Sequence, residues 1–279
     1  AMDTTVSIIV IDENVEKAKA AIKAAYDEIK RIETLMSAED EASEIYLLNH
    51  NGTAWTQLSC ESIYILKKAI EYSELSDGYF DPTVKPLVDL WMKKTKKTGR
   101  IPRPEELTEA MELVGWKNLA IDENRKMARF LQEGMQVTLG AIAKGYAVDR
   151  GYEILKDFGV ESGLVNIGGD LRGFGSRTWR IGIQDPRGKG ILEVLELENF
   201  SIATSGDYMR MFFIGKRRIH HLINPKTGEP ATECMSVTVI TENCVDADAL
   251  STAVFVMGPT RGIEPVSYTH LTLPTKRIV

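Results

Sequence analysis

The strongest candidate for chemistry in this sequence is the segment 245–252, in which Asp248 and Thr252 stand four residues apart. The apolar run 253–257 continues it as a helix, which would place both side chains on one face, one turn apart. A carboxylate and a hydroxyl are hard oxygen ligands, which suit Mg²⁺ better than a metal that prefers thiolates. The structural alternative is that Asp246 or Asp248 caps the helix and Thr252 bonds back to the backbone.

A second segment, 138–146, carries small residues that lead into an expected helix. The N–H groups of the first helical turn and the mobile cation of Lys144 together suit a phosphate, although the Walker spacing is missing. Gly145 lies inside this helix, where glycine costs about 1 kcal/mol relative to alanine. We therefore expect another backbone or a ligand to come close to Gly145.

Aromatic and basic candidates lie elsewhere. Tyr79 and Phe80 stand beside Asp81 in the turn before Pro82, where they either hold a ring system or belong to the core. Two adjacent histidines, 220–221, are expected in a strand and would point to opposite faces, so at most one of them faces a site.

Two glycine-containing segments complete the set. Segment 203–208 offers two hydroxyls and Asp207 before an expected strand. Segment 166–175 superficially resembles a dinucleotide fingerprint, but its glycine spacing is wrong and a strand follows it, which excludes a Rossmann interpretation. Metal-binding oxygens, a phosphate-friendly helix start, stacking aromatics and a candidate base suggest phosphoryl chemistry on a flat, phosphorylated cofactor.

The helices and strands expected to position these residues are unevenly distributed along the chain. Hydrophobic periodicity and capping residues predict helices early and strands late. The expected helices are 15–36, 59–75, 104–114 and 143–158, and the expected strands are 3–11, 163–166, 179–184, 192–197, 208–213, 217–223 and 236–241. This order favours the α+β class, with mixed, largely antiparallel sheets and packed helices.

Composition narrows the class of protein. The 279 residues are 43% hydrophobic with a net charge of −6, and no basic stripe with interleaved aromatics points to nucleic acid. The basic run 93–97 is expected to be a solvated loop. Three cysteines match neither a zinc site nor a disulfide framework, and no run reaches the ~18 apolar residues of a membrane span. Ala1 and Met2 look like a cloning remnant, so an export signal is expected to have been removed.

Six ordered segments resemble the motifs of the ApbE family, the FAD:protein FMN transferases; they are 77–91, 140–149, 165–169, 204–208, 221–228 and 247–258. The resemblance implies one catalytic unit with an ApbE-like, T-fold-like fold over residues 1–258, followed by an atypical tail, 259–279. It also implies a Mg²⁺-dependent enzyme that cleaves FAD and releases AMP. FMN is then attached by a phosphoester bond to a threonine or serine of an acceptor redox protein. Such proteins are usually exported, often as membrane-anchored lipoproteins, so an extracytoplasmic location is expected.

The resemblance also implies roles for individual residues. Asp248, Thr252 and the backbone carbonyl of Ala141 resemble the metal ligands. His221 is the candidate base, with Asp207 as the alternative, and Lys144 adds a positive charge at the phosphates. The residues that match FAD contacts are Met2, Asn49, Tyr79, Phe80, Asp81, Thr138, Lys144, His221 and Ile223. The family often has aspartate where Thr138 stands.

Two other functions remain open from the sequence. An FAD pyrophosphatase that uses water in place of an acceptor hydroxyl would need the same residues. A protein that binds FAD without turnover would keep the ring and phosphate contacts alone.

Overall fold

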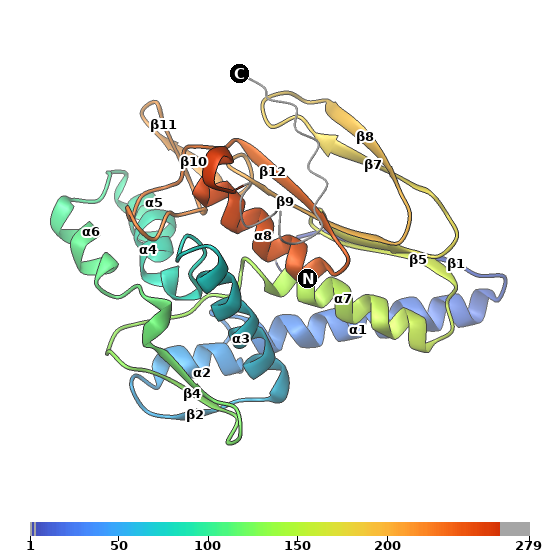
Figure 1. The fold of residues 1–279 in the computed structure, drawn as a ribbon, viewed down its shortest axis with the longest axis horizontal. Helices are drawn as coiled ribbons and strands as arrows, with labels where there is room; N and C mark the ends of the chain where they lie inside the picture. Colours follow the sequence, from blue (N-terminus) through green and yellow to red (C-terminus); the bar gives the residue numbers. More distant parts are fainter. Residues whose placement is uncertain (1, 3, 263–279) are drawn as a thin grey trace.

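The computed structural model describes residues 2 and 4–262 of the chain. The described residues form a five-stranded antiparallel sheet with the strand order β1-β5-β6-β9-β12 (Figure 1). Strands far apart in the sequence are neighbours in this sheet, so its register brings the middle and the end of the chain together. The strands are β1 (Val6–Ile11), β5 (Ser162–Ile167), β6 (Asp170–Phe174), β9 (Phe200–Gly206) and β12 (Ser236–Thr241).

Three helices cover one face of this sheet: α1 (Val15–Met36), α7 (Ala143–Asp157) and α8 (Cys244–Met257). In Figure 1, α1 and α7 run side by side, and α8 lies beside the start of α7. The helix α3 (Cys60–Leu75) packs against this layer. Aliphatic side chains such as Ile29 and Ile32 are fully buried between the layers, so burial of apolar area holds these helices in place.

Two hairpins extend from the sheet. β7 (Trp179–Gln184) and β8 (Ile191–Leu197) form an antiparallel pair, seen at the upper right of Figure 1. Trp179 of this hairpin packs on Phe200 and Ile202 of β9, in a small core distinct from the one under the helices. The second pair consists of β10 (Met211–Ile214) and β11 (Arg217–His220).

The segment between α1 and α7 holds short elements around a small antiparallel sheet of the described chain, with strand order β2-β4-β3. They support the loops that reach the site rather than forming a separate layer. They are α2 (Glu44–His50), β2 (Thr56–Gln57), η1 (Pro82–Val84), α4 (Lys85–Asp89), η2 (Leu90–Thr95), α5 (Lys96–Thr98), α6 (Pro104–Met111), η3 (Trp116–Asn118), β3 (Leu119–Asp122) and β4 (Met127–Phe130).

The predicted α+β class with antiparallel sheets is confirmed. The predicted helix 15–36 and strands 179–184 and 236–241 have the observed bounds. The first strand begins at Val6, not at residue 3, and the strand predicted from residue 208 begins at Met211. The middle strand β6 and its neighbour β9 were not predicted; in β9 almost all residues are buried, which removes the alternation that marks a half-exposed strand.

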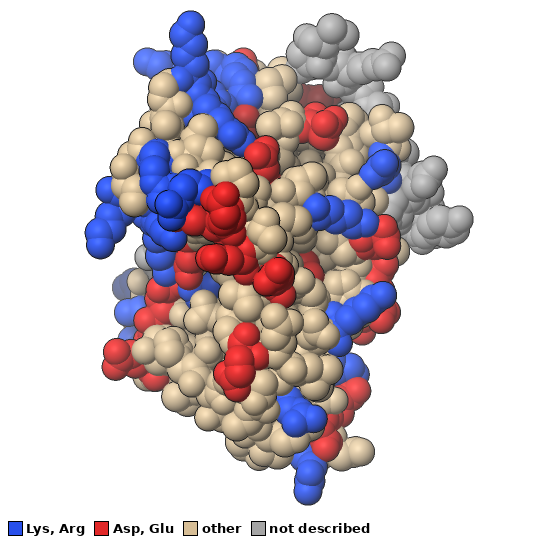
Figure 2. All heavy atoms as spheres, turned by 90° about the vertical axis from the view of Figure 1, so that its left-hand side faces the viewer, with Lys and Arg blue, Asp and Glu red and all other residues tan. Residues whose placement is uncertain are grey.

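The prediction that 93–97 is a loop is wrong. Residues 90–95 form a π-helix and 96–98 continue it as α-helix. Lys93 pairs with Glu39 and Lys94 with Glu106, each at 2.8 Å, so these lysines are held on a helix by acids from other segments. Figure 2 shows the corresponding side of the molecule, where Lys and Arg side chains gather toward the upper left and acidic side chains border them.

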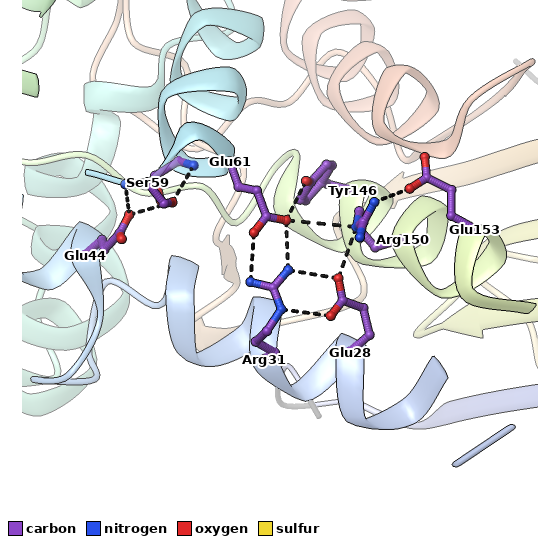
Figure 3. A network of polar contacts seen from close by, with 9 residues as sticks. Glu28, Arg31, Glu44, Ser59, Glu61, Tyr146, Arg150 and Glu153 are labelled. Atoms are coloured by element: carbon purple, nitrogen blue, oxygen red, sulfur yellow. Dashed lines mark hydrogen bonds and ion pairs between the residues drawn. The ribbon is translucent and has the colours of Figure 1, made fainter. Parts of the chain in front are cut away.

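A charged network ties the helices that carry the site (Figure 3). Arg31 of α1 bonds Glu28 and Glu61 at 2.8 Å, and Arg150 of α7 bonds Glu28 at 3.1 Å. The Tyr146 hydroxyl donates to Glu61 at 2.8 Å. Because these groups are partly exposed, each contact adds little stability, but together they fix α1, α3 and α7 relative to one another.

Within the described residues, no helix combines the length and the apolar composition needed to cross a membrane. Of the predicted tail 259–279, residues 263–279 lie outside the described residues.

Candidate active site

The site is organised where the start of α7 meets α8, and Gly145 is the residue that permits this contact. A Cβ at position 145 would lie 2.3 Å from the carbonyl oxygen of Cys244 and 2.8 Å from the Cα of Val245. The Gly145 N–H donates to Asp248 Oδ2 at 3.0 Å. The predicted close approach at Gly145 is therefore confirmed, and the approaching group is the backbone of α8.

The start of α8 is capped by a residue from another helix. Asp149 of α7 accepts from the N–H groups of Cys244 and Val245, both at 2.9 Å, and pairs with Arg172. The carboxylate of Asp246 instead accepts from the Tyr72 hydroxyl at 2.6 Å. The capping role considered for the α8 aspartates is therefore wrong. Asp149 performs it and leaves Asp248, one turn into the helix, available for other contacts.

The Lys144 ammonium lies between two buried carboxylates. It bonds Asp248 Oδ1 at 3.1 Å and also bonds Asp170 Oδ2. Asp170 and Asp248 are 2% and 3% exposed, so the group holds two carboxyl groups and one ammonium away from bulk water. Burial lowers the pKa of Lys144, but the two carboxylates outweigh it and the net shift is upward. Lys144 is therefore protonated, and positively charged, at neutral pH.

Asp170 is the member of this group that the sequence analysis did not select. Burial raises the pKa of its carboxyl, repulsion from Asp248 adds to the rise, and Lys144 opposes it. Its sequence signal was a carboxylate directly after the glycine pair 168–169, inside the segment rejected as a dinucleotide motif. That signal indicates a tight turn but does not reveal which side chain the aspartate meets.

Hydroxyl groups lie next to this cluster. Thr252 Oγ1 is 3.0 Å from Ser205 Oγ, which is 2.9 Å from Ser251 Oγ. Asp248 and Thr252 stand one turn apart on α8, as the sequence predicted, and Ala141 lies in the turn that precedes Lys144. Asp248, Ser205, Ser251 and Thr252 thus place carboxylate and hydroxyl oxygens on neighbouring parts of α8 and β9.

The two adjacent histidines differ in burial, but β11 ends at His220 and not at residue 223, so the predicted strand alternation does not extend to His221. His220 is buried, and its Nε2 lies 2.9 Å from the carbonyl oxygen of Ala231. His221 is half-buried, and among the described residues its buried Nδ1 has no hydrogen-bond partner. Burial, followed by the charge of Arg210, lowers the pKa of His221 to about 4, with Lys144 adding a smaller effect. His221 is therefore a neutral imidazole in electrostatic range of Lys144.

Asp207 is occupied by two guanidinium groups. Arg187 bonds both of its oxygens, at 2.7 and 2.6 Å, and Arg218 bonds Oδ1 at 2.9 Å. Burial raises the pKa of this carboxyl, but the two arginines outweigh it and the net shift is downward. Because guanidinium groups engage both carboxylate oxygens, Asp207 is not free to accept a proton in this arrangement, and it acts as an anchor that ties the β7–β8 loop to β11.

Asn49 and Thr138 make hydrogen bonds that hold the segment leading to the start of α7. The Asn49 side chain bonds both backbone groups of Val137, accepting from its N–H at 2.7 Å and donating to its carbonyl at 2.9 Å. The Thr138 N–H donates to the carbonyl of Pro82 at 2.8 Å. Asn49, predicted as an FAD contact, uses its amide to hold the segment that leads to Ala141 and Lys144.

We expect Asn49→Ala to lower the free energy of unfolding by about 2–4 kcal/mol, because two buried backbone groups of Val137 would lose their partners. Thermal unfolding followed by circular dichroism measures this. A variant with unchanged stability and weakened FAD binding would instead show that Asn49 acts as a ligand contact.

The segment 79–81 divides between core and surface. Phe80 is 3% exposed and packs in the core against Tyr72. Its ring therefore contacts the core and not the surface, where a ligand was predicted to bind it. The Asp81 carboxylate accepts from the Thr83 N–H and hydroxyl, at 2.8 and 2.6 Å, and from the Trp116 N–H at 3.0 Å. Both Asp81 oxygens therefore serve the fold.

Tyr79 is the member of this segment that reaches a cavity. The cavity has a volume of about 350 Å³ and is also lined by Asn224, Glu233 and residues 256–261. The Lys226 ammonium lies 4.3 Å from the centre of the Tyr79 ring, and Arg261 bonds the Tyr79 hydroxyl. An open aromatic ring with two cations beside it can contact a phosphorylated ring compound.

The remaining predicted contacts are peripheral in the described structure. Ile223 is 4% exposed and pairs with Pro230 in an isolated bridge. The Met2 N–H donates to Glu33, and its side chain packs on the main core. Lys144, Asp248, Thr252 and His221 are thus brought into one region, whereas Phe80, Asp81 and Asn49 support it from behind.

Comparison with known proteins places this site in a family. The family model described as "ApbE family" matches residues 2–273. The FAD:protein FMN transferase of Haemophilus influenzae is 32% identical, covering 92% of this chain and 77% of that protein. The one from Vibrio cholerae is 34% identical, over 84% of this chain and 72% of that protein.

Solved structures agree. The ApbE protein of Thermotoga maritima superposes with a TM-score of 0.90 at 37% identity, covering 96% of this chain and 88% of that one. The flavin transferase ApbE of Vibrio cholerae gives a TM-score of 0.83 at 29% identity, with coverage of 96% and 88%. The fold and the named relatives thus identify an enzyme of the transferase class. The chain belongs to the ApbE family.

Proposed function

We propose that this protein is a Mg²⁺-dependent FAD:protein FMN transferase that attaches FMN to a threonine or serine of an acceptor redox protein and releases AMP. The observation that carries the proposal is the Lys144 ammonium between Asp170 and Asp248, beside the hydroxyl of Thr252. Relatives named FAD:protein FMN transferase support it.

The donor set fits Mg²⁺. Asp248, Thr252 and the carbonyl of Ala141 would supply only oxygen atoms, which Mg²⁺ prefers. Each Asp248 oxygen keeps a free lone pair beyond its present bond, and Asp170 shares the Lys144 ammonium with Asp248. No group of three or more His, Cys, Asp or Glu side chains suited to a metal occurs in the described chain, so the metal proposal depends on Asp248 together with hydroxyl and carbonyl oxygens. When bound, Mg²⁺ would supply positive charge that offsets the charge developing on the two phosphates.

The residues of the chain have separate tasks in the transfer. Lys144 places a second positive charge at the phosphates. Tyr79 and the cavity beside it would hold a ring of FAD. The acceptor hydroxyl forms a bond to the FMN-side phosphorus while the bond from that phosphorus to the anhydride oxygen breaks, so AMP leaves with that oxygen. His221 takes the hydroxyl proton on a ring nitrogen.

We expect His221→Ala to slow FMN transfer by about 10²-fold, the lower end for loss of a general base, while FAD affinity changes little. Because the pKa of His221 is lowered to about 4, its neutral form persists as the pH falls, and it is protonated only near pH 4. The transfer rate should therefore be insensitive to His221 protonation between about pH 6 and 8, with an acid limb near pH 4 that disappears in the variant. Initial rates across pH measure this, and an acid limb near 6.5 would contradict it.

The proposed function is tested by incubating the protein with FAD, Mg²⁺ and an acceptor domain and measuring the intact mass of the acceptor. A mass increase by one FMN, together with AMP release, is expected. AMP and free FMN without any gain in acceptor mass would identify a pyrophosphatase instead, and FAD binding without AMP would identify a protein that only binds FAD.

We also propose, on the basis of the family resemblance, that the native protein acts outside the cytoplasm as a membrane-anchored lipoprotein. Fractionation of cells that express the gene under its own start signals tests it. Recovery of the protein in the cytoplasmic fraction alone would contradict it.

A further inference from the structure

Asp170 occupies one of the most constrained positions next to the site. It is the first residue of β6 and pairs across the β5–β6 hairpin with Ile167. The two residues of the turn, Gly168 and Gly169, have φ angles of 62° and 103°, which favour glycine. Because β6 lies between β5 and β9, both edges of its backbone are held by the sheet. The Asp170 carboxylate is therefore presented from rigid backbone and not from a loop.

Asp170 has neighbours on two elements. The Lys144 ammonium of α7 bonds its Oδ2, and the backbone of Thr204 on β9 lies near enough to lower the pKa of the same carboxyl. Lys144 has a long, flexible stem, and its side chain is 28% exposed, so it can also turn toward solvent. Asp170 is the fixed group that opposes this motion.

We propose that Asp170 is a positioning residue for flavin transfer, which holds the Lys144 ammonium at the α7–α8 crossing and so keeps a negative charge on Asp248 for a cation. This inference rests on the proposed function.

The charges of the cluster explain why this role needs a carboxylate. When Asp170 is ionised, one ammonium is shared between two carboxylates, and one net negative charge remains. If Asp170 were neutral, Lys144 would either neutralise Asp248 alone or leave for solvent. The first outcome weakens attraction for a cation, and the second removes a positive charge from the phosphates. Either outcome lowers turnover through Lys144 and not through a contact of Asp170 with substrate.

A double-mutant cycle isolates this dependence on Lys144. Turnover of FAD to AMP with Mg²⁺ is measured for the parent, Asp170→Asn, Lys144→Met and the double variant. We expect Asp170→Asn to lower kcat by about 10- to 100-fold, as for other residues that orient a ligand, with a much smaller change in KM. In the Lys144→Met background, the same substitution should lower kcat by no more than about twofold. If the two substitutions lower kcat independently, so that the double variant shows the product of the two single losses, the proposal is overturned.

Asp149→Asn is the matched control. Asp149 is also a buried, ion-paired carboxylate, but its partners are Arg172 and the start of α8. Its substitution should lower stability and should have the same effect in both Lys144 backgrounds. A loss of kcat that depends on Lys144 for both aspartates would point to general damage of the core, and would overturn a specific role of Asp170.

A second measurement follows Lys144 without turnover. The protein is treated briefly with an amine-acylating reagent, and modification of Lys144 is measured by peptide mass spectrometry. Asp170→Asn should speed Lys144 modification by about tenfold, the size of effect expected when an orienting partner is lost, and leave surface lysines unchanged. If the parent releases no AMP, the proposed function fails, while this experiment still decides whether Asp170 holds Lys144. Unchanged modification would overturn the proposal.

Should Asp170→Asn fail to fold, Asp170→Glu keeps the charge but moves the carboxylate by one methylene. It is expected to lower kcat and to speed Lys144 modification. If kcat and the rate of Lys144 modification both equal those of the parent protein, the position of the carboxylate does not matter and the proposal is overturned.

Discussion

Asp248→Asn is expected to abolish Mg²⁺-dependent release of AMP from FAD, with turnover lower by about 10³-fold, the upper range for removal of one group that stabilises transition-state charge. Asparagine keeps an acceptor oxygen for the Gly145 N–H, but its amide NH₂ group then faces the Lys144 ammonium. A moderate loss of thermal stability is therefore expected as well, and turnover is measured well below the unfolding temperature. Chromatographic measurement of AMP over time, with and without Mg²⁺, gives the result.

Asp246→Asn provides the comparison within the same helix. Asp246 lies two residues before Asp248, but its carboxylate bonds Tyr72 and Lys68 on α3. We expect this variant to keep AMP release within about threefold of the parent, because the substitution removes no contact of the Lys144 group. Near-normal turnover in Asp248→Asn would remove the metal assignment, and equal losses in both variants would assign the effect to packing of α8.

Gly145→Ala is expected to be the most damaging methyl addition in the site. The new Cβ would meet the Cys244 carbonyl, which belongs to backbone and cannot rotate away. Overpacking of this kind costs about 3 kcal/mol, and a chain of this length would unfold about 6–12 °C lower. Separation of α7 from α8 would also break the bond from Gly145 to Asp248, so AMP release should fall even below the unfolding temperature. Thermal unfolding and turnover of the same sample measure both effects.

Gly190→Ala is the control for the added methyl group. Among the described residues, no atom lies within 4 Å of a Cβ at Gly190, in the turn between β7 and β8. We expect a shift of the unfolding midpoint below about 2 °C and full activity. A Gly145→Ala protein as stable as this control would show that α7 and α8 can move apart without loss.

The sequence predicted the parts of this protein that depend on local pattern. The helix 15–36 and the strands 179–184 and 236–241 have clear caps or alternation, and the structure reproduces their bounds. The crossing at Gly145 was expected because an interior glycine in a helix is costly unless something approaches it. β9 was missed because a strand buried on both faces carries no alternating pattern.

The site itself was predicted only where a motif named its residues. Asp248, Thr252 and Lys144 were selected, and they come together. Asp170 was not selected, because its importance lies in meeting Lys144, which is 26 residues away in sequence. Asn49 was assigned to FAD, but its partner is the backbone of Val137, 88 residues away. A motif indicates that a certain residue type is required at a position. It does not show whether that residue contacts a ligand or makes a hydrogen bond within the fold.

The order in which the site residues occur along the chain has a consequence for biosynthesis. Lys144 and Asp170 emerge from the ribosome well before Asp248, because α8 is the last long helix of the described chain. Until α8 arrives, Asp149 lacks the two amides that it caps, and the Gly145 N–H lacks its carboxylate. A nascent chain that stops short of α8 keeps the pairs of Lys144 with Asp170 and of Arg172 with Asp149, but it lacks Asp248 and the cavity beside Tyr79, so the site is complete only after nearly all of the described chain has been synthesised.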